Sequence, residues 1–139
     1  MMDGEQVKAL YLRGIEHMER REIDAAAATF LAVIAHTPDH ADAHYQLSNA
    51  LLMRGEFRPG WHEYVWWHKL DGAKGKLPRL AAPLWNGMRL PRGRILLLGD
   101  QGYGDTIQFA RYLPLVAERC GELVIGCDPA LTPLLPRIP

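Results

Sequence analysis

The chain has 139 residues, enough for one or two small domains, and 48% of them are hydrophobic, which suffices for a packed core. Its sixteen basic and sixteen acidic residues cancel, so the composition indicates neither nucleic acid nor an anionic membrane surface as a partner. No apolar run approaches the ~18 residues of a membrane span.

The N-terminal sequence MMDGEQVK is not a signal peptide, and Cys120 and Cys127 do not form a C-x-x-C pair. We therefore expect two reduced, structural thiols and a cytoplasmic protein.

Residues 5–70 contain an internal repeat with a period of about 34 residues, which is typical of tetratricopeptide repeats with two antiparallel helices each. The matched pairs are Gly14 and Ser48, Arg20 and Arg54, Glu22 and Glu56, Ile23 and Phe57, Ala26 and Gly60, and Phe30 and Tyr64. We expect helices at about 5–20, 24–36, 41–54 and 58–70, with the small matched residues where paired helices approach closely.

By resemblance to this repeat family, the first helix of each pair lines a concave face, where we expect a protein or peptide partner. The candidate binding residues are Tyr11, Ile15, Met18, Tyr45, Asn49 and Leu52. The basic residues of repeat proteins that clamp a carboxylate are missing at Tyr11 and Tyr45, so acidic C-terminal peptides are a weak expectation.

The fourth predicted helix carries Trp61, Tyr64 and Trp67 at helical spacing, with Trp66 on another face. Two repeats are few, since such units bury their apolar faces on neighbours. We expect this stripe to pack against the following domain; the alternative is a platform on which a sugar stacks.

His36, His40 and His44 are four residues apart, but Pro38 interrupts a continuous helix and no third ligand for a metal is evident. We interpret these residues as surface histidines of a polar turn and predict no metal site.

Residues 71–93 are rich in glycine, proline and basic residues and have no period, so they are predicted to form a linker, anchored by Trp85. The following stretch, Arg94–Tyr112, is predicted to form a strand, a glycine-rich turn and a helix. The continuous apolar run Ile95–Leu98 suits a strand of a parallel sheet that is covered on both faces.

The sequence D-x-x-Q from Asp105 to Gln108 is a plausible capping box that opens the helix. Pro114 should bend this helix. The residues expected to face the sheet are Ile107, Ala110, Leu113 and Val116.

The glycine-rich turn contains Gly99, Gly102 and Gly104, and this spacing does not match the dinucleotide fingerprint G-x-G-x-x-G. Gly99–Thr106 fits the phosphate-binding P-loop except at its lysine, where Asp105 would repel phosphates, so we reject an ATPase or GTPase. A carboxylate at a helix start suits a base that acts on a hydroxyl, and equally a helix cap; the two roles are compatible.

A second strand is predicted at Glu122–Cys127, parallel to the first, and a further helical stretch at Ala130–Leu135. This is the first β-α-β-α unit of a doubly wound sheet, exposed at both edges. We favour a truncated domain, and self-association through the strand edges or docking on the repeats remain open.

The sequence GDQGYGDTIQFARYLPLVAERC resembles the start of the glycosyltransferase-like domain that some bacterial proteins join to tetratricopeptide repeats. That domain is similar to glycosyltransferase family 9, the heptosyltransferases, which have a GT-B fold. The segments FRPGWHEYVWW and PLWNGMRL extend the resemblance, which covers roughly Phe57 to the C-terminus. In that family a Gly-Asp pair follows the first strand, and Gly104 and Asp105 stand at the matching place.

The resemblance implies that Asp105 is the catalytic base and that the surrounding loop binds the acceptor substrate. The implied substrate-binding residues are Gln101, Gly102, Tyr103, Gly104 and Thr106. No metal and no cofactor is implied, and a nucleotide-sugar is expected only where a second domain is present.

The predicted architecture is two α-helical repeat pairs (1–70), a linker (71–93) and an incomplete α/β Rossmann-like unit (94–139). Alone, the chain is expected to bind protein and not to transfer sugar. The alternatives are a stand-alone repeat scaffold and a small-nucleotide-binding protein.

Overall fold

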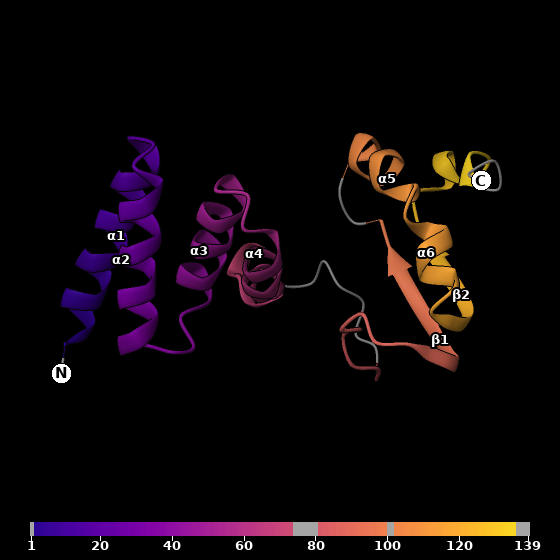
Figure 1. Ribbon diagram of the computed structural model, residues 1–139, viewed down its shortest axis with the longest axis horizontal. Helices are drawn as coiled ribbons and strands as arrows, with labels where there is room; N and C mark the ends of the chain where they lie inside the picture. Colours follow the sequence, from indigo (N-terminus) through magenta and orange to yellow (C-terminus); the bar gives the residue numbers. More distant parts are fainter. Residues whose placement is uncertain (1, 74–80, 100–101, 136–139) are drawn as a thin grey trace. The chain divides into compact units, whose positions relative to one another are not determined.

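A computed structural model describes residues 2–73, 81–99 and 102–135 of the chain. The chain divides into two compact units, Met1–Leu77 and Pro78–Pro139. Figure 1 shows helices only in the first unit and both strands in the second. Within the described ranges, no helix is both long enough and apolar enough to cross a membrane.

The first unit contains the four predicted helices, arranged as two antiparallel pairs. They are α1 (Gly4–Glu19), α2 (Ile23–His36), α3 (Ala41–Met53) and α4 (Phe57–Tyr64). The last helix is shorter than predicted, because the chain tightens at Val65 into the 3-10 helix η1 (Val65–Lys69), followed by η2 (Asp71–Ala73).

The two helix pairs repeat the same backbone turn, one sequence period apart. In the first turn, the N–H groups of Arg21 and Glu22 donate to the carbonyls of Met18 and His17. In the second turn, the equivalent donors are Gly55 and Glu56 and the equivalent acceptors are Leu52 and Leu51. The sequence period is therefore also a structural period.

Ring contacts follow the same period. Tyr11 of α1 packs on Phe30 of α2 with ring centroids 5.9 Å apart, and Tyr45 of α3 packs on Tyr64 of α4 at 5.6 Å. Phe30 is fully buried. The core cluster around it consists of Ala26, Ala27, Phe30, Leu47 and Ala50.

Small residues allow the helices of each pair to approach, as predicted. A Cβ atom added to Gly14 would lie 2.5 Å from the ring of Phe30, and one added to Gly60 would lie 2.8 Å from Leu52. These distances are shorter than van der Waals contact, so a larger residue at either position would force the helices apart.

The two turns differ in one residue, and this difference leads to a prediction. Arg21 has φ +60° and its equivalent Gly55 has φ +79°. The left-handed conformation costs a residue with a Cβ about 1–2 kcal/mol, whereas glycine adopts it freely but loses more entropy on folding. We expect Arg21→Gly to raise the free energy of unfolding by about 0.5 kcal/mol, measured by chemical denaturation.

The reciprocal variant is Gly55→Ala, which should lower the free energy of unfolding by about 1 kcal/mol. No atom lies within 4 Å of an added Cβ at Gly55, so the backbone conformation alone causes this loss. Effects of the same sign in the two variants would contradict the explanation.

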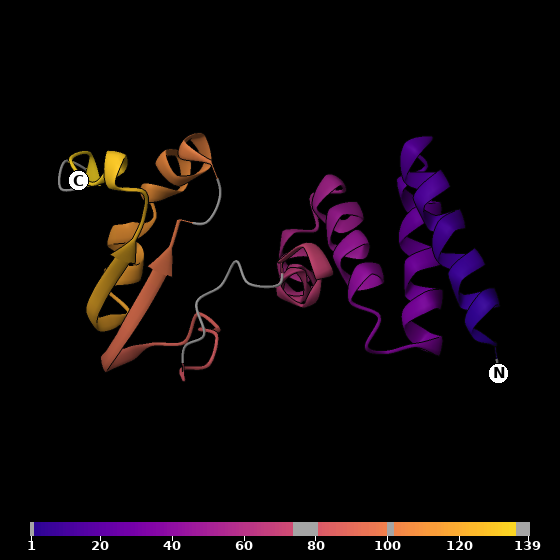
Figure 2. The same ribbon diagram turned by 180° about the vertical axis from the view of Figure 1, so that it is seen from behind.

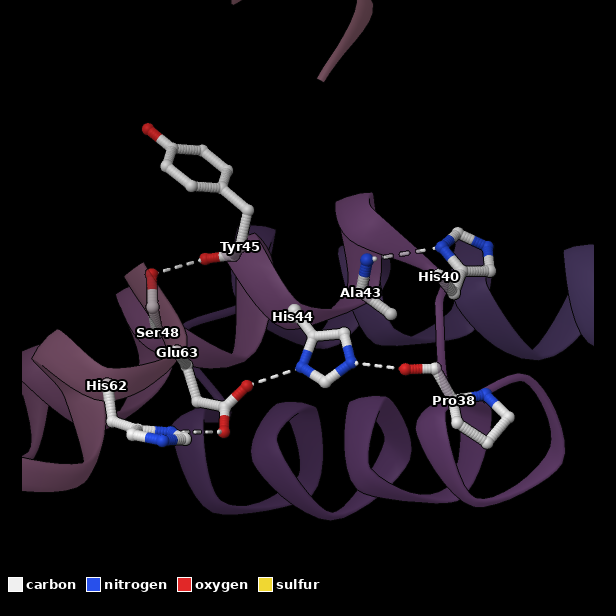
Figure 3. Close-up of polar contacts among 8 residues, drawn as sticks. All are labelled: Pro38, His40, Ala43, His44, Tyr45, Ser48, His62 and Glu63. Atoms are coloured by element: carbon white, nitrogen blue, oxygen red, sulfur yellow. Dashed lines mark hydrogen bonds and ion pairs between the residues drawn. The ribbon is translucent and has the colours of Figure 1, made fainter. Parts of the chain in front are cut away.

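His44 is buried, which corrects the prediction of surface histidines for this residue. One ring nitrogen contacts the carboxylate of Glu63 on α4, and the other lies 2.9 Å from the carbonyl oxygen of Pro38 (Figure 3). The ring also stacks on Trp66 of η1, with centroids 3.9 Å apart and the planes parallel within 1°. Sequence spacing could not reveal these contacts, because Pro38 and Glu63 meet His44 only in the folded unit.

The second unit contains a two-stranded sheet of β1 (Leu90–Leu98) and β2 (Cys120–Gly126). The strands are parallel, as predicted, and Figure 2 shows both arrows pointing the same way. Between them lie α5 (Tyr103–Ala110) and α6 (Leu113–Ala117), and η3 (Pro129–Leu131) follows β2. The first strand begins at Leu90, inside the predicted linker.

Only one face of this sheet is well covered by the described residues, so the prediction of a strand buried on both faces is wrong. Ile95 is 3% exposed, whereas Leu96 is 39% exposed and its neighbour on β2, Val124, is 36% exposed. Leu97 and Ile125 lie against Phe109 and Leu113 of the helices, and the described residues place no helix over Leu96 and Val124.

Two details of the predicted helix are also wrong. The N-cap residue is Gly102, and no side chain caps α5, so Asp105 lies inside the first turn and closes no capping box. The helix does not bend at Pro114: α5 ends at Ala110 and α6 begins at Leu113. Pro114 is thus in the first turn of α6, where its missing N–H costs little.

The predicted sheet-facing side is partly correct. Ala110 is buried, but Ile107 is 55% exposed. Thr106 lies against β1 instead, because α5 begins at Tyr103 and its inward side is set by that start.

Candidate functional site

The carboxyl ends of β1 and β2 meet at one edge of the sheet. Gly99 follows β1, and its N–H donates to the carbonyl of Gly126 at 2.8 Å. A Cβ atom on Gly99 would lie 2.9 Å from Oγ1 of Thr106. Gly99 therefore lets the first turn of α5 lie close to the end of the strand.

The start of α5 is held by its own backbone. The N–H of Thr106 donates to the carbonyl of Gly102 at 3.1 Å, and the Thr106 hydroxyl donates to the same oxygen at 3.3 Å. Gly104, predicted to lie in the turn, is part of α5, and a Cβ there would meet no atom within 4 Å.

Asp105 is exposed in the first turn of α5. Its carboxylate has no hydrogen-bond or ion-pair partner among the residues that the structure describes. The unpaired N–H groups and the dipole of a helix N-terminus favour a negative charge there. Asp105 thus presents a free carboxylate at the sheet edge.

A pocket of about 240 Å³ opens beside this carboxylate. Asp105 and Thr106 provide its polar side chains, and the rest of its lining is apolar apart from the Gly99 backbone. The apolar lining residues are Leu97, Leu98, Phe109, Ala110, Leu113, Ile125 and Leu135. Such a pocket, with few polar groups at its rim, is typical of small-molecule sites.

Tyr103 and Asp128 meet at the same edge, from the loops that follow the two strands. The Tyr103 hydroxyl donates to the Asp128 carboxylate, and this bond together with the Asp128 charge raises the pKa of Tyr103. Asp128 also accepts from the N–H of Ala130 at 2.8 Å. Asp128 was not predicted as a site residue from the sequence; its position directly after the second strand was the available signal.

This contact leads to a pH prediction. Because the pKa of Tyr103 is raised above the ordinary 10.0, the contact contributes to stability below pH 10.0 and is lost as the pH rises through the raised pKa. We expect Asp128→Asn to lower the tyrosinate midpoint of Tyr103, measured by ultraviolet difference spectra against Tyr103→Phe. A midpoint that Asp128→Asn leaves unchanged would contradict the contact.

The other predicted substrate-binding residues are only partly brought together. Gly102, Tyr103, Asp105 and Thr106 gather at the start of α5, whereas Gln101 lies outside the described residues.

The predicted protein-binding residues are on α1 and α3, and most of them make internal contacts. Tyr11, Ile15 and Met18 pack against the core cluster, and Leu52 packs on Gly60. The ring of Tyr45 points away from the contacts of His44 (Figure 3).

Tyr11 joins α1 to α3. Its ring stacks on His40 with centroids 5.2 Å apart. Burial, and then the nearby charge of Asp42, raise the pKa of Tyr11, while a hydrogen bond with Gln46 opposes them. Its ring is therefore only partly available to a partner.

Within the described ranges, no three His, Cys, Asp or Glu side chains gather closely enough to hold a metal ion. Cys120 and Cys127 are free, half-buried thiols.

A curated relative, Protein FlbA of Caulobacter vibrioides, is 29% identical over 138 residues. The match covers 94% of this chain but 23% of FlbA, so the chain spans about a quarter of that relative's length. No family model matches the chain, and no solved structure matches it significantly.

Proposed function

We propose that the chain joins a protein-interaction module of the tetratricopeptide type to the acceptor-binding side of a GT-B glycosyltransferase. One observation carries the enzymatic part: the Asp105 carboxylate is free among the described residues and stands at the mouth of an apolar pocket, at the carboxyl edge of a parallel sheet. Ligands of open α/β sheets bind at this edge.

In the proposed reaction, the acceptor hydroxyl attacks the sugar carbon of a nucleotide-sugar. Asp105 takes the hydroxyl proton as the new C–O bond forms, and the bond between that carbon and the nucleotide phosphate breaks. Thr106 and Tyr103, with the N–H groups at the start of α5, orient polar groups of the acceptor. A second domain, outside this chain, holds the nucleotide-sugar.

The repeated helix pairs support the interaction module. Turns, ring contacts and small residues recur with the period that is typical of tetratricopeptide repeats. In this role the α1 and α3 side brings a protein or peptide to the enzyme, with Tyr45 and Asn49 as contacts. We also place the protein in the cytoplasm, where the free thiols Cys120 and Cys127 stay reduced.

The test is consumption of nucleotide-sugars by a longer protein that contains this chain and a donor-binding domain. We expect one donor of a panel to be consumed in the presence of an acceptor, and none by the 139-residue chain alone. Turnover of no donor by the longer protein would leave the stand-alone repeat scaffold, which the helix pairs alone support.

A further inference from the structure

An exposed apolar ridge runs along α4 and into η1. Phe57, Trp61 and Val65 are four residues apart and are 62%, 51% and 49% exposed. The edge of Trp61 packs on the ring of Tyr64, with centroids 5.3 Å apart, so the indole is held in place. We call Phe57, Trp61 and Val65 the α4 ridge.

The structural repeat shows what covers this position in the preceding helix pair. Ile23 and Ala27 of α2 are the equivalents of Phe57 and Trp61, one repeat period earlier. Ala27 is 3% exposed and belongs to one core cluster with Leu47 and Ala50 of α3. In this fold, therefore, an amphipathic helix covers the ridge.

The chain itself does not supply the equivalent helix. The segment one repeat period after α3 is 75–87; it contains Pro78 and Pro83, and its described residues, 81–87, form no helix. A second copy in head-to-tail order would offer α1, but its residues equivalent to Leu47 and Ala50 are Arg13 and Glu16, both exposed and charged. Placing these charges on Trp61 would bury them without a partner.

We propose that the α4 ridge is a docking surface for an amphipathic helix of a partner protein, with a small residue opposite Trp61. The size follows from the repeat: α3 places the large Leu47 in the cluster that contains the small Ala27, whereas α4 has the large Trp61 at that position. A well-packed interface then needs a small residue from the partner. This proposal is independent of the glycosyltransferase reaction, because it rests on the helix pairs alone.

The probe is a peptide with the sequence of α3, Ala41–Met53, crosslinked on its outer face to keep it helical, and a second peptide that carries Leu47→Ala. Binding to the full chain is measured by fluorescence anisotropy. We expect the Leu47→Ala peptide to bind the native chain more tightly. Trp61→Ala in the chain, which recreates the α2 ridge, should reverse this preference.

The matched surface variants are Trp61→Asp on the ridge and Leu31→Asp on α2, where Leu31 is 54% exposed. We expect Trp61→Asp to weaken binding of the Leu47→Ala peptide at least about tenfold, as for an aromatic hot spot, and Leu31→Asp to leave it unchanged. No binding by either peptide would overturn the proposal. A Trp61-dependent dimer, or acrylamide quenching that Trp61→Phe leaves unchanged in the free chain, would also overturn it, because the ridge would already be covered.

Discussion

Asp105→Asn should lower the turnover of the longer, sugar-transferring protein by about a hundredfold to ten-thousandfold, the usual contribution of a general base. Asparagine has the shape of aspartate but cannot take a proton from the acceptor hydroxyl. The substitution should leave the fold intact, because Asp105 does not cap α5 and has no side-chain partner among the described residues. The measurement is kcat at saturating donor and acceptor.

Glu118→Gln is the matched control, since Glu118 is an exposed carboxylate at the end of α6, outside the pocket. It should leave kcat unchanged. Equal kcat for native protein and Asp105→Asn would end the base role and leave Asp105 with its favourable position at the helix dipole.

The second large effect concerns stability. Phe30→Ala should lower the free energy of unfolding of the first unit by about 3–5 kcal/mol. Phe30 is 0% exposed, fills the space left by Gly14 and contacts Tyr11, so its removal leaves a cavity between α1 and α2. Chemical denaturation followed by circular dichroism measures the loss.

The neighbouring residue provides the control. Leu31 is 54% exposed, and Leu31→Ala should change the free energy of unfolding by no more than about 0.5 kcal/mol. Similar losses for the two variants would mean that the core does not lie between the helix pairs as described.

The helix pairs could be predicted from the sequence because packing imposes their pattern. Helices that touch at Gly14 and Gly60 require small residues there, and a constant repeat period aligns such positions without any knowledge of the fold. The parallel strands were predictable for a related reason: a crossover of helical length between two apolar strands leaves little choice of direction.

The errors concern features that depend on distant contacts or on a helix start. His44 is buried because Glu63, nineteen residues later, and Trp66 pack on it. The motif D-x-x-Q failed as a capping box because α5 begins earlier, at Tyr103, and Asp105 is already helical.

The candidate site was predictable only in part. The position of Asp105 after the first strand was visible in the sequence, whereas the pairing of the two loops was not: Tyr103 meets Asp128 through the parallel register of β1 and β2. The exposed side chains of Leu96 and Val124 were missed because an apolar run alone does not say whether both faces are covered.

The most direct test of the proposed reaction is a solved structure of the longer protein with its sugar acceptor bound. We predict an acceptor hydroxyl about 2.6–3.2 Å from a carboxylate oxygen of Asp105, with the acceptor's apolar part in the pocket beside α5. An acceptor bound away from this edge of the sheet, or a nucleotide phosphate in contact with the start of α5, would contradict the proposed reaction.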